Sequence, residues 1–276
     1  MNLAGKQMEF QHVAKRAWRQ ARTNSGLRSA YAFLKPTLRI GKHLLGGASP
    51  VLVYQMGSVG SKSISRSLRK GGYSGLVHHA HDLRDGSRSS REEAIYRFCI
   101  DGPIGIKVIS LVRDPIARNV SAFFQDFEKW AGVPHEKYEG DTEGLIDKFI
   151  KHYDHELPLR WFDRWEETLG VDIYDYPFPE RGYNFISKGA MQVLTLRTEL
   201  PDDVKEKAIR KFLSVGNFGL ERRNDGARKP YAERYAQFKQ SFTAPDSYIT
   251  KMYESEFFQH FYTDKHRNQF ENRWSA

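Results

Sequence analysis

The chain has 276 residues, of which 39% are hydrophobic and 28% charged, as expected of a folded soluble protein with one large α/β domain or two small ones. Its formal net charge of +9 suits an anionic partner such as a nucleotide, an acidic glycan, a nucleic acid or a membrane surface. A single cysteine, Cys99, excludes an intrachain disulfide framework. No apolar run approaches the ~20 residues that span a bilayer, and the polar N-terminus lacks the apolar region of a secretory signal, so we expect a cytoplasmic protein.

Residues 1–48 form a basic N-terminal extension that precedes the main domain, residues 49–276. Apolar residues recur in it at near-helical spacing (Phe10, Val13, Ala14, Trp18 and Ala21), with lysines and arginines between them. We expect a helix packed on the main domain or a tail. The alternative is an amphipathic helix in peripheral contact with an anionic membrane.

Two strands are predicted, each followed by a turn and a helix. The run Val51–Met56 indicates a buried strand, and a small-residue loop then leads into a helix that Gly71 and Gly72 end. Ile104–Val112 is the second strand, after which Asp114 suits the N-cap and Pro115 the first position of a helix that reaches about Trp130.

The rest of the chain continues this alternation. We expect a loop over 131–144, a helix over Leu157–Leu169, strands over Val171–Tyr174 and Gln192–Leu196, a long functional loop over 216–234 and a last helix over Tyr248–Phe261. Alternating strands and helices predict an α/β fold with a central parallel sheet flanked by helices on both faces.

The first candidate phosphate site is the loop between the first strand and its helix. Its glycines would let the backbone approach a phosphate, while free amides and the helix dipole stabilise the anion. The loop is a poor Walker A motif, because Ser61 stands where a glycine should precede the lysine and the first glycine spacing is one residue short. The candidate ligands are Gly57, Ser58, Val59, Gly60, Ser61, Lys62 and Ser63.

The second candidate phosphate site begins where the second strand ends. Arg113 leaves the strand, and Ser121 lies eight residues on, about two turns into the following helix. The two side chains are placed to converge on one phosphate, with charge-assisted bonds from the arginine. Arg118 shares a helix face with Ser121. Ligands bind at this edge of open α/β sheets.

Together the two motifs resemble those of the sulfotransferases that use 3′-phosphoadenosine-5′-phosphosulfate (PAPS). The loop is similar to their 5′-phosphosulfate loop, and R-D-P-x-x-R-x-x-S-x-F from Arg113 to Phe123 is similar to their 3′-phosphate motif. The closer resemblance is to a bacterial, sulfotransferase-like family of putative capsular polysaccharide synthesis proteins, from about residue 50 to the C-terminus. Four stretches carry it: Tyr54–Gly57, Trp161–Asp163, Leu196–Leu200 and Phe261–Tyr262. The resemblance implies a P-loop-like nucleotide-binding architecture.

The resemblance implies sulfuryl transfer from PAPS, as a co-substrate, to a hydroxyl acceptor that is expected to be a glycan. The family's loops usually carry lysine at the position of Ser58, and here the nearest lysine is Lys62, which we expect to supply charge at the leaving oxygen. A base must take the hydroxyl proton. His79 and His81 follow the predicted first helix, so we expect them at a strand end beside the loop, and His81 ranks before His79 for this role. These histidines are too close in sequence for most chelating geometries, so no metal is expected.

Two other functions remain open. A P-loop-type nucleotide phosphotransferase would need a proper Walker A loop and an aspartate that holds Mg²⁺. A non-catalytic sulfotransferase-like domain that binds nucleotide or glycan would explain Ser58. Dispersed basic residues without a recognition motif argue against nucleic acid as a partner. Lys229 and Tyr231, in the loop over 216–234, are candidate adenosine contacts from composition alone.

Overall fold

The computed structural model describes residues 34, 37, 38, 40, 41, 47–221 and 229–275. The basic extension expected over 1–48 therefore lies almost wholly outside the described residues, as does the middle of the loop expected over 216–234.

A five-stranded sheet forms the centre of the fold, with strand order β2-β1-β3-β5-β4. The neighbours β2, β1, β3 and β5 run parallel, and β4 is an antiparallel edge strand beside β5. This confirms an α/β fold with a mostly parallel central sheet. The strands are β1 (Val51–Tyr54), β2 (Val77–Ala80), β3 (Ile106–Val112), β4 (Tyr183–Lys188) and β5 (Met191–Arg197).

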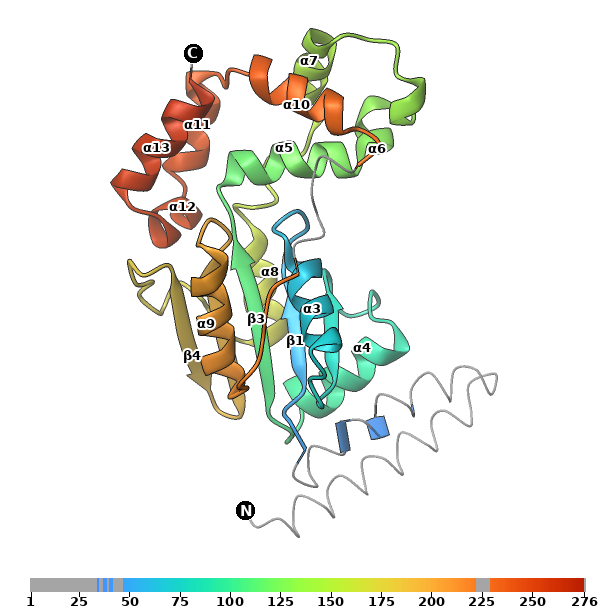
Figure 1. Cartoon of the computed structure of the whole chain (residues 1–276), viewed down its shortest axis with the longest axis vertical. Helices are drawn as coiled ribbons and strands as arrows, with labels where there is room; N and C mark the ends of the chain where they lie inside the picture. The colour runs from blue at the N-terminus through green and yellow to red at the C-terminus, as the bar shows by residue number, and fades with distance from the viewer. Residues whose placement is uncertain (1–33, 35–36, 39, 42–46, 222–228, 276) are drawn as a thin grey trace.

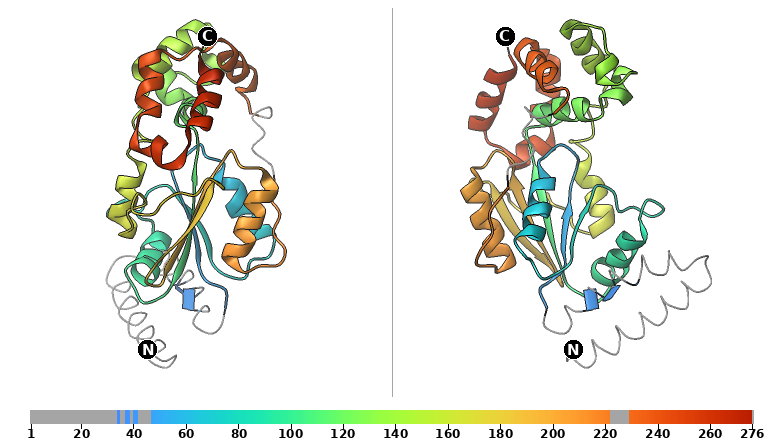
Figure 2. Two further views of the ribbon diagram at one scale, coloured as in Figure 1. Left: turned by 90° about the vertical axis from the view of Figure 1, so that its left-hand side faces the viewer. Right: turned by 45° about the vertical axis from the view of Figure 1, so that its right-hand side comes forward.

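Helices cover both faces of the sheet and the edge where the parallel strands end. Figures 1 and 2 show α3 and α9 on one face, α4 and α8 on the other, and the remaining helices gathered beyond the end of β3. We call these remaining helices, α5–α7 and α10–α13, the helical lobe. The helices are α3 (Ser61–Lys70), α4 (Ser90–Ile95), α5 (Pro115–Gln125), α6 (Phe127–Ala131), α7 (Thr142–His152), α8 (Trp161–Leu169), α9 (Asp202–Leu213), α10 (Ala232–Ser241), α11 (Asp246–Tyr253), α12 (Glu256–Phe261) and α13 (Asp264–Trp274).

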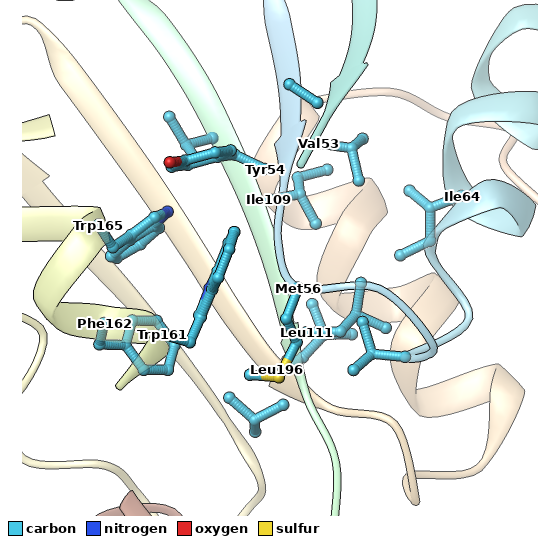
Figure 3. Close-up of a cluster of buried hydrophobic side chains, with 14 of the residues drawn as sticks. Val53, Tyr54, Met56, Ile64, Ile109, Leu111, Trp161, Phe162, Trp165 and Leu196 are labelled. Carbon is cyan, nitrogen blue, oxygen red and sulfur yellow. The ribbon is translucent and has the colours of Figure 1, made fainter. Parts of the chain in front are cut away.

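The core packs against both faces of β1, all four residues of which are buried. Tyr54 points to one face, where its ring lies 5.3 Å from that of Trp161 and 6.5 Å from that of Trp165 (Figure 3). Val53 points to the other face, toward Ile64 of α3 (Figure 3). Because the strand is buried on both faces, its sequence is continuously apolar, which made it easy to predict.

Several expected elements differ from those observed. Val171–Tyr174 is not a strand, because the Asp172 carboxylate accepts a hydrogen bond from the Tyr174 amide and the chain turns there. The sheet instead gains β4, which was not expected. The helix expected to run from residue 115 to Trp130 breaks at Asp126, whose backbone is not helical (φ −109°, ψ 36°).

Two more helices have different bounds. The helix expected over Leu157–Leu169 begins only at Trp161, and the last aromatic helix is divided into α11 and α12, where Ser255 caps the second segment. Within the described ranges, no helix has both the length and the apolar character needed to cross a bilayer.

Candidate anion-binding and catalytic site

The loops that follow β1 and β3 meet at one edge of the sheet. β1 lies between β2 and β3. After β1 the chain first forms β2 on one side of it and then crosses to form β3 on the other side. In open α/β sheets such a reversal leaves a crevice at the carboxyl ends of the strands, where ligands bind. Both motifs predicted from the sequence therefore lie at the position where a ligand is expected.

The β1–α3 loop has the backbone conformation of an anion-binding concavity. Ser58 and Gly60 both adopt left-handed conformations, with φ of 69° and 85°. Gly60 precedes α3, and no side chain caps this helix end. Among the described residues, the amides of residues 57–62 have no hydrogen-bond acceptor. Free amides in such a turn, at the positive end of a helix dipole, favour a bound anion.

Three side chains hold the carbonyl oxygens of this loop. Arg118 Nε donates to Gly57 O (3.2 Å) and Arg113 Nη1 donates to Ser58 O (2.7 Å). Thr198 Oγ1 donates to Val59 O (3.0 Å). In a trans peptide the carbonyl and the next amide point in opposite directions, so the amides of residues 58–60 face away from these three donors. We call Arg113, Arg118 and Thr198 the carbonyl clamp.

The hydroxyls and the lysine predicted to assist the loop have different environments. Ser61 is buried and its Oγ lies 2.8 Å from His79 Nε2. Ser63 is partly exposed, and its amide donates to Gly60 O. Lys62 is exposed in the first turn of α3 and forms no ion pair within the described ranges. Its role at a leaving oxygen remains a prediction.

The two candidate bases lie at the end of β2, beside the loop, as expected. His79 is the register partner of Val53 in β1. Burial lowers its pKa to about 4, and the charges of His81 and Lys62 act in the same direction, so His79 is neutral at physiological pH. His81 follows the strand and is exposed, and its ring lies edge-on to that of His79 at 4.4 Å.

The hydrogen bond of His81 fixes its tautomer. His81 Nδ1 lies 2.8 Å from Gln55 O. Since a carbonyl oxygen only accepts, Nδ1 carries the proton, and Nε2 of the neutral ring has a free lone pair. The third histidine, His78, points to the other face of the sheet and lies 3.1 Å from Glu92 Oε1 of α4. Among His78, His79 and His81, only His81 therefore combines exposure with a defined acceptor nitrogen.

Arg113 is partly exposed and lies against the loop, whereas the side chain of Ser121 makes no hydrogen bond within the described ranges. Their convergence on one phosphate remains a prediction. Behind Arg113 lies Asp114, which caps α5 as expected and is completely buried. Burial raises its pKa, and its oxygens accept from Ile116 N, Tyr253 Oη and Trp274 Nε1.

Glu199, which follows the clamp residue Thr198, connects the ends of β3 and β5. Its carboxylate accepts from the Asp114 amide at 2.8 Å and from Tyr262 Oη at 3.2 Å. Removal of the carboxylate from water and its proximity to Asp114 raise its pKa. Sequence reasoning missed Thr198 and Glu199 as site residues. Their position directly after β5, next to β3 in the sheet, is the signal that would have found them.

Two features lie away from this edge. A cavity of about 670 Å³ opens at the opposite end of the sheet, between the segments that follow α3 and α9, and Lys107 and Phe218 are among its lining residues. It is not part of the candidate site. Within the described ranges, no group of three His, Cys, Asp or Glu side chains is arranged to hold a metal ion.

Lys229 and Tyr231, the candidate adenosine contacts, lie directly before α10 of the helical lobe. Lys229 Nζ donates to Tyr231 Oη at 2.9 Å, and the Tyr231 ring lies 5.8 Å from that of Phe124 in α5. Tyr231 thus packs against α5, and Lys229 contacts Tyr231. Nothing in the described contacts connects them with the β1–α3 loop.

Comparison with known proteins gives one match. The model of a family described as "Putative capsular polysaccharide synthesis protein" matches residues 135–263, a little under half of the chain. Searches of curated proteins and of solved structures return no significant match. The matched region contains Thr198, Glu199 and most of the helical lobe, while the β1–α3 loop, Arg113 and Arg118 lie outside it. The chain is therefore similar to this family over residues 135–263.

Proposed function

We propose that the protein is a PAPS-dependent sulfotransferase that transfers a sulfuryl group to a hydroxyl group of a glycan. The observation that carries the proposal is the β1–α3 loop, whose carbonyls are bound from behind while its amides have no acceptor among the described residues. Residues 135–263 are similar to a family whose description names capsular polysaccharide synthesis, and this supports the choice of a glycan acceptor.

The reaction is an in-line displacement at sulfur. The acceptor oxygen attacks the sulfur atom, the bond from sulfur to the 5′-phosphate oxygen breaks, and adenosine 3′,5′-bisphosphate leaves. His81 Nε2 takes the hydroxyl proton. The amides of residues 58–62 stabilise the charge that develops on the departing phosphate, and Lys62 adds a positive charge there. Arg113 and Ser121 hold the 3′-phosphate, which sets the register of the donor.

A non-catalytic domain that binds nucleotide or glycan is the second candidate, and the serine at position 58 favours it. The phosphotransferase alternative is weaker. It would need a carboxylate at a strand end to hold Mg²⁺, but both oxygens of Asp114 already accept hydrogen bonds from groups of the helical lobe.

Calorimetric titration with adenosine 3′,5′-bisphosphate, compared with ATP and Mg²⁺, tests the donor class. Micromolar binding of the bisphosphate without metal is the expected result. Transfer of labelled sulfuryl groups from PAPS to a panel of polysaccharides then separates the enzyme from the non-catalytic domain. Binding only of ATP with Mg²⁺, or of neither nucleotide, would overturn the proposal.

The role of His81 gives a sharper test of catalysis. We expect His81→Asn to lower the rate of transfer by about 10²- to 10⁴-fold, the usual contribution of a general base, with little change in bisphosphate affinity. His152→Asn, an exposed histidine of α7, is the matched control and should keep wild-type activity. Full activity of His81→Asn would move the role to His79 or to another base.

A further inference from the structure

Arg118 is a buried cation whose hydrogen-bond partners are all neutral. The residue is 3% exposed. Besides Gly57 O, its guanidinium donates from Nη1 to Asn119 Oδ1 and to Tyr153 Oη, each at 3.0 Å. No carboxylate forms an ion pair with it within the described ranges, and Nη2 has no hydrogen-bond partner there. Asp126 and Asp154, the carboxylates whose charges act on it, are exposed.

A buried charge of this kind is costly for a fold. An arginine that serves only stability is normally paired with a carboxylate, because an unpaired ion costs several kcal/mol to remove from water. Burial lowers the pKa of Arg118 accordingly, although the side chain stays charged. A bound anion would supply the negative charge that Arg118 lacks. Arg118 contacts the back of the β1–α3 loop, whose amides would bind that anion.

The surroundings of Arg118 fix its orientation. His155 Nε2 donates to Phe149 O at 2.8 Å, so His155 Nδ1 must accept, and Tyr248 Oη donates to it at 2.8 Å. Asn119 Nδ2 then donates to Tyr248 Oη, which leaves Asn119 Oδ1 to accept from Arg118. The two ends of this chain set its direction, because Phe149 O can only accept and the Arg118 guanidinium can only donate. Arg118 is thus held from the helical lobe in one orientation.

The residue at the start of the loop provides a second observation. The side chain of Gln55 is completely buried, and neither of its polar atoms has a hydrogen-bond partner within the described ranges. Buried polar groups without partners are rare in folded proteins and mark sites of strain or function. The carbonyl clamp therefore fixes the loop by hydrogen bonds, while the Gln55 side chain at its start has no partner within the described ranges.

We propose that Arg118 is a positioning residue that holds the β1–α3 loop in its anion-binding shape and supplies the positive charge behind it. The proposal rests on the proposed function only in taking the bound anion to be the phosphosulfate end of the donor. Arg118 orients the Ser58 amide through Gly57 O. Its charge favours an anion at the loop without touching it.

Binding of two probes, adenosine 3′,5′-bisphosphate and inorganic pyrophosphate, to the full chain tests this role. Arg118→Met keeps most of the side-chain volume and removes both the positive charge and the planar set of guanidinium N–H donors. We expect it to weaken binding of both probes by between about 10- and 100-fold, the loss of one charge-assisted hydrogen bond. Its melting temperature should stay within about 5 °C of wild type, because replacing a buried ion with an apolar residue of similar volume is often tolerated.

Three further variants separate positioning from general structure. Thr198→Val removes the clamp bond to Val59 O without changing any charge, and should also weaken binding. Arg118→Lys keeps the positive charge but not the planar guanidinium donors, and should bind both probes more tightly than Arg118→Met does. Arg160→Met, an exposed arginine before α8, is the matched control and should bind both probes as wild type does.

The outcomes distinguish this proposal from the proposed function. Binding of pyrophosphate but not of the bisphosphate by the wild type would refute the sulfotransferase and leave the role of Arg118 intact. Wild-type affinity in a folded Arg118→Met would overturn the positioning role, whatever the donor is. Absence of binding of either probe by the wild type would overturn both.

Discussion

At the scale of single residues, His79 and His81 show how two neighbours acquire different chemistry. His79 belongs to β2 and is hydrogen-bonded to Ser61, while His81 lies just beyond the strand and is exposed. The sequence placed both beside the loop, because a strand that follows the first helix must end at this edge. It did not predict that His79 is partly buried and His81 exposed, because that depends on the register of β2 against β1 and on how α3 packs.

The pKa of His79 predicts how stability depends on pH. The folded protein takes up this proton only near pH 4, whereas an unfolded histidine takes it up near pH 6.5. The unfolded chain therefore binds more protons within this window, and stability should rise with pH from about 4 to 6.5. Melting temperatures at pH 4.5 and 7.5 should differ less in His79→Gln than in wild type.

This difference should shrink but not vanish, because burial also lowers the pKa values of His78, His155 and His260, and these act in the same direction. An identical pH dependence in wild type and His79→Gln would mean that His79 does not lose its charge on folding.

At the scale of elements, the β1–α3 turn gives a matched pair of glycine variants. Gly60 has a φ of 85°, so Gly60→Ala should lower the free energy of unfolding by about 1–2 kcal/mol through backbone strain alone, since a Cβ there meets nothing within 4 Å. Gly57 has no positive φ and is equally open, so Gly57→Ala should leave stability unchanged. Urea unfolding measures both.

The same pair tests where the anion binds. If the open space beside Gly57 receives the ligand, the methyl group of Gly57→Ala should weaken bisphosphate binding without any loss of stability. Equal loss of stability in the two variants would show that the turn does not have the conformation described here.

The sequence predicted β1 and β3 because both are largely buried and apolar, and a glycine (Gly57) or a proline (Pro115) follows three residues after each strand. It missed β4, an edge strand with only one fully buried residue, Ile186. It also assigned a strand to Val171–Tyr174, where the buried residues Val171 and Ile173 belong to a turn. Alternation along the chain cannot distinguish a buried turn from a short strand, because the difference comes from the side chain of Asp172.

At the scale of the whole molecule, hydrogen bonds to Asp114 connect the C-terminal helices to the end of β3. Trp274, in the last turn of α13, donates to Asp114 Oδ2 at 2.9 Å across 160 positions of sequence. Tyr253 of α11 donates to Asp114 Oδ1. The sequence identified Asp114 as a helix cap but could not predict these contacts, since no local pattern indicates which distant side chain will reach a buried carboxylate.

The contact between Asp114 and Trp274 leads to a testable coupling. In Asp114→Asn, Oδ1 can still accept from Ile116 N and Tyr253 Oη, but the amide nitrogen then faces Trp274 Nε1, and two donors oppose each other. We expect this variant to lose about 2–3 kcal/mol of unfolding free energy, the cost of a buried group left unsatisfied. Trp274→Phe should lose about 1–2 kcal/mol, because it keeps most of the packing and removes only the donor.

In the double variant the opposed donors no longer exist, so its loss should be smaller than the sum of the single losses by about 1 kcal/mol or more. Additive losses would mean that α13 is stabilised by packing alone. If Asp114 and Trp274 are coupled in this way, the affinity of Asp114→Asn for the bisphosphate should also fall. Asp114 caps the first turn of α5, and this helix places Arg118 against the loop. Restored affinity in the double variant would then connect the position of the C-terminal helix to the anion site.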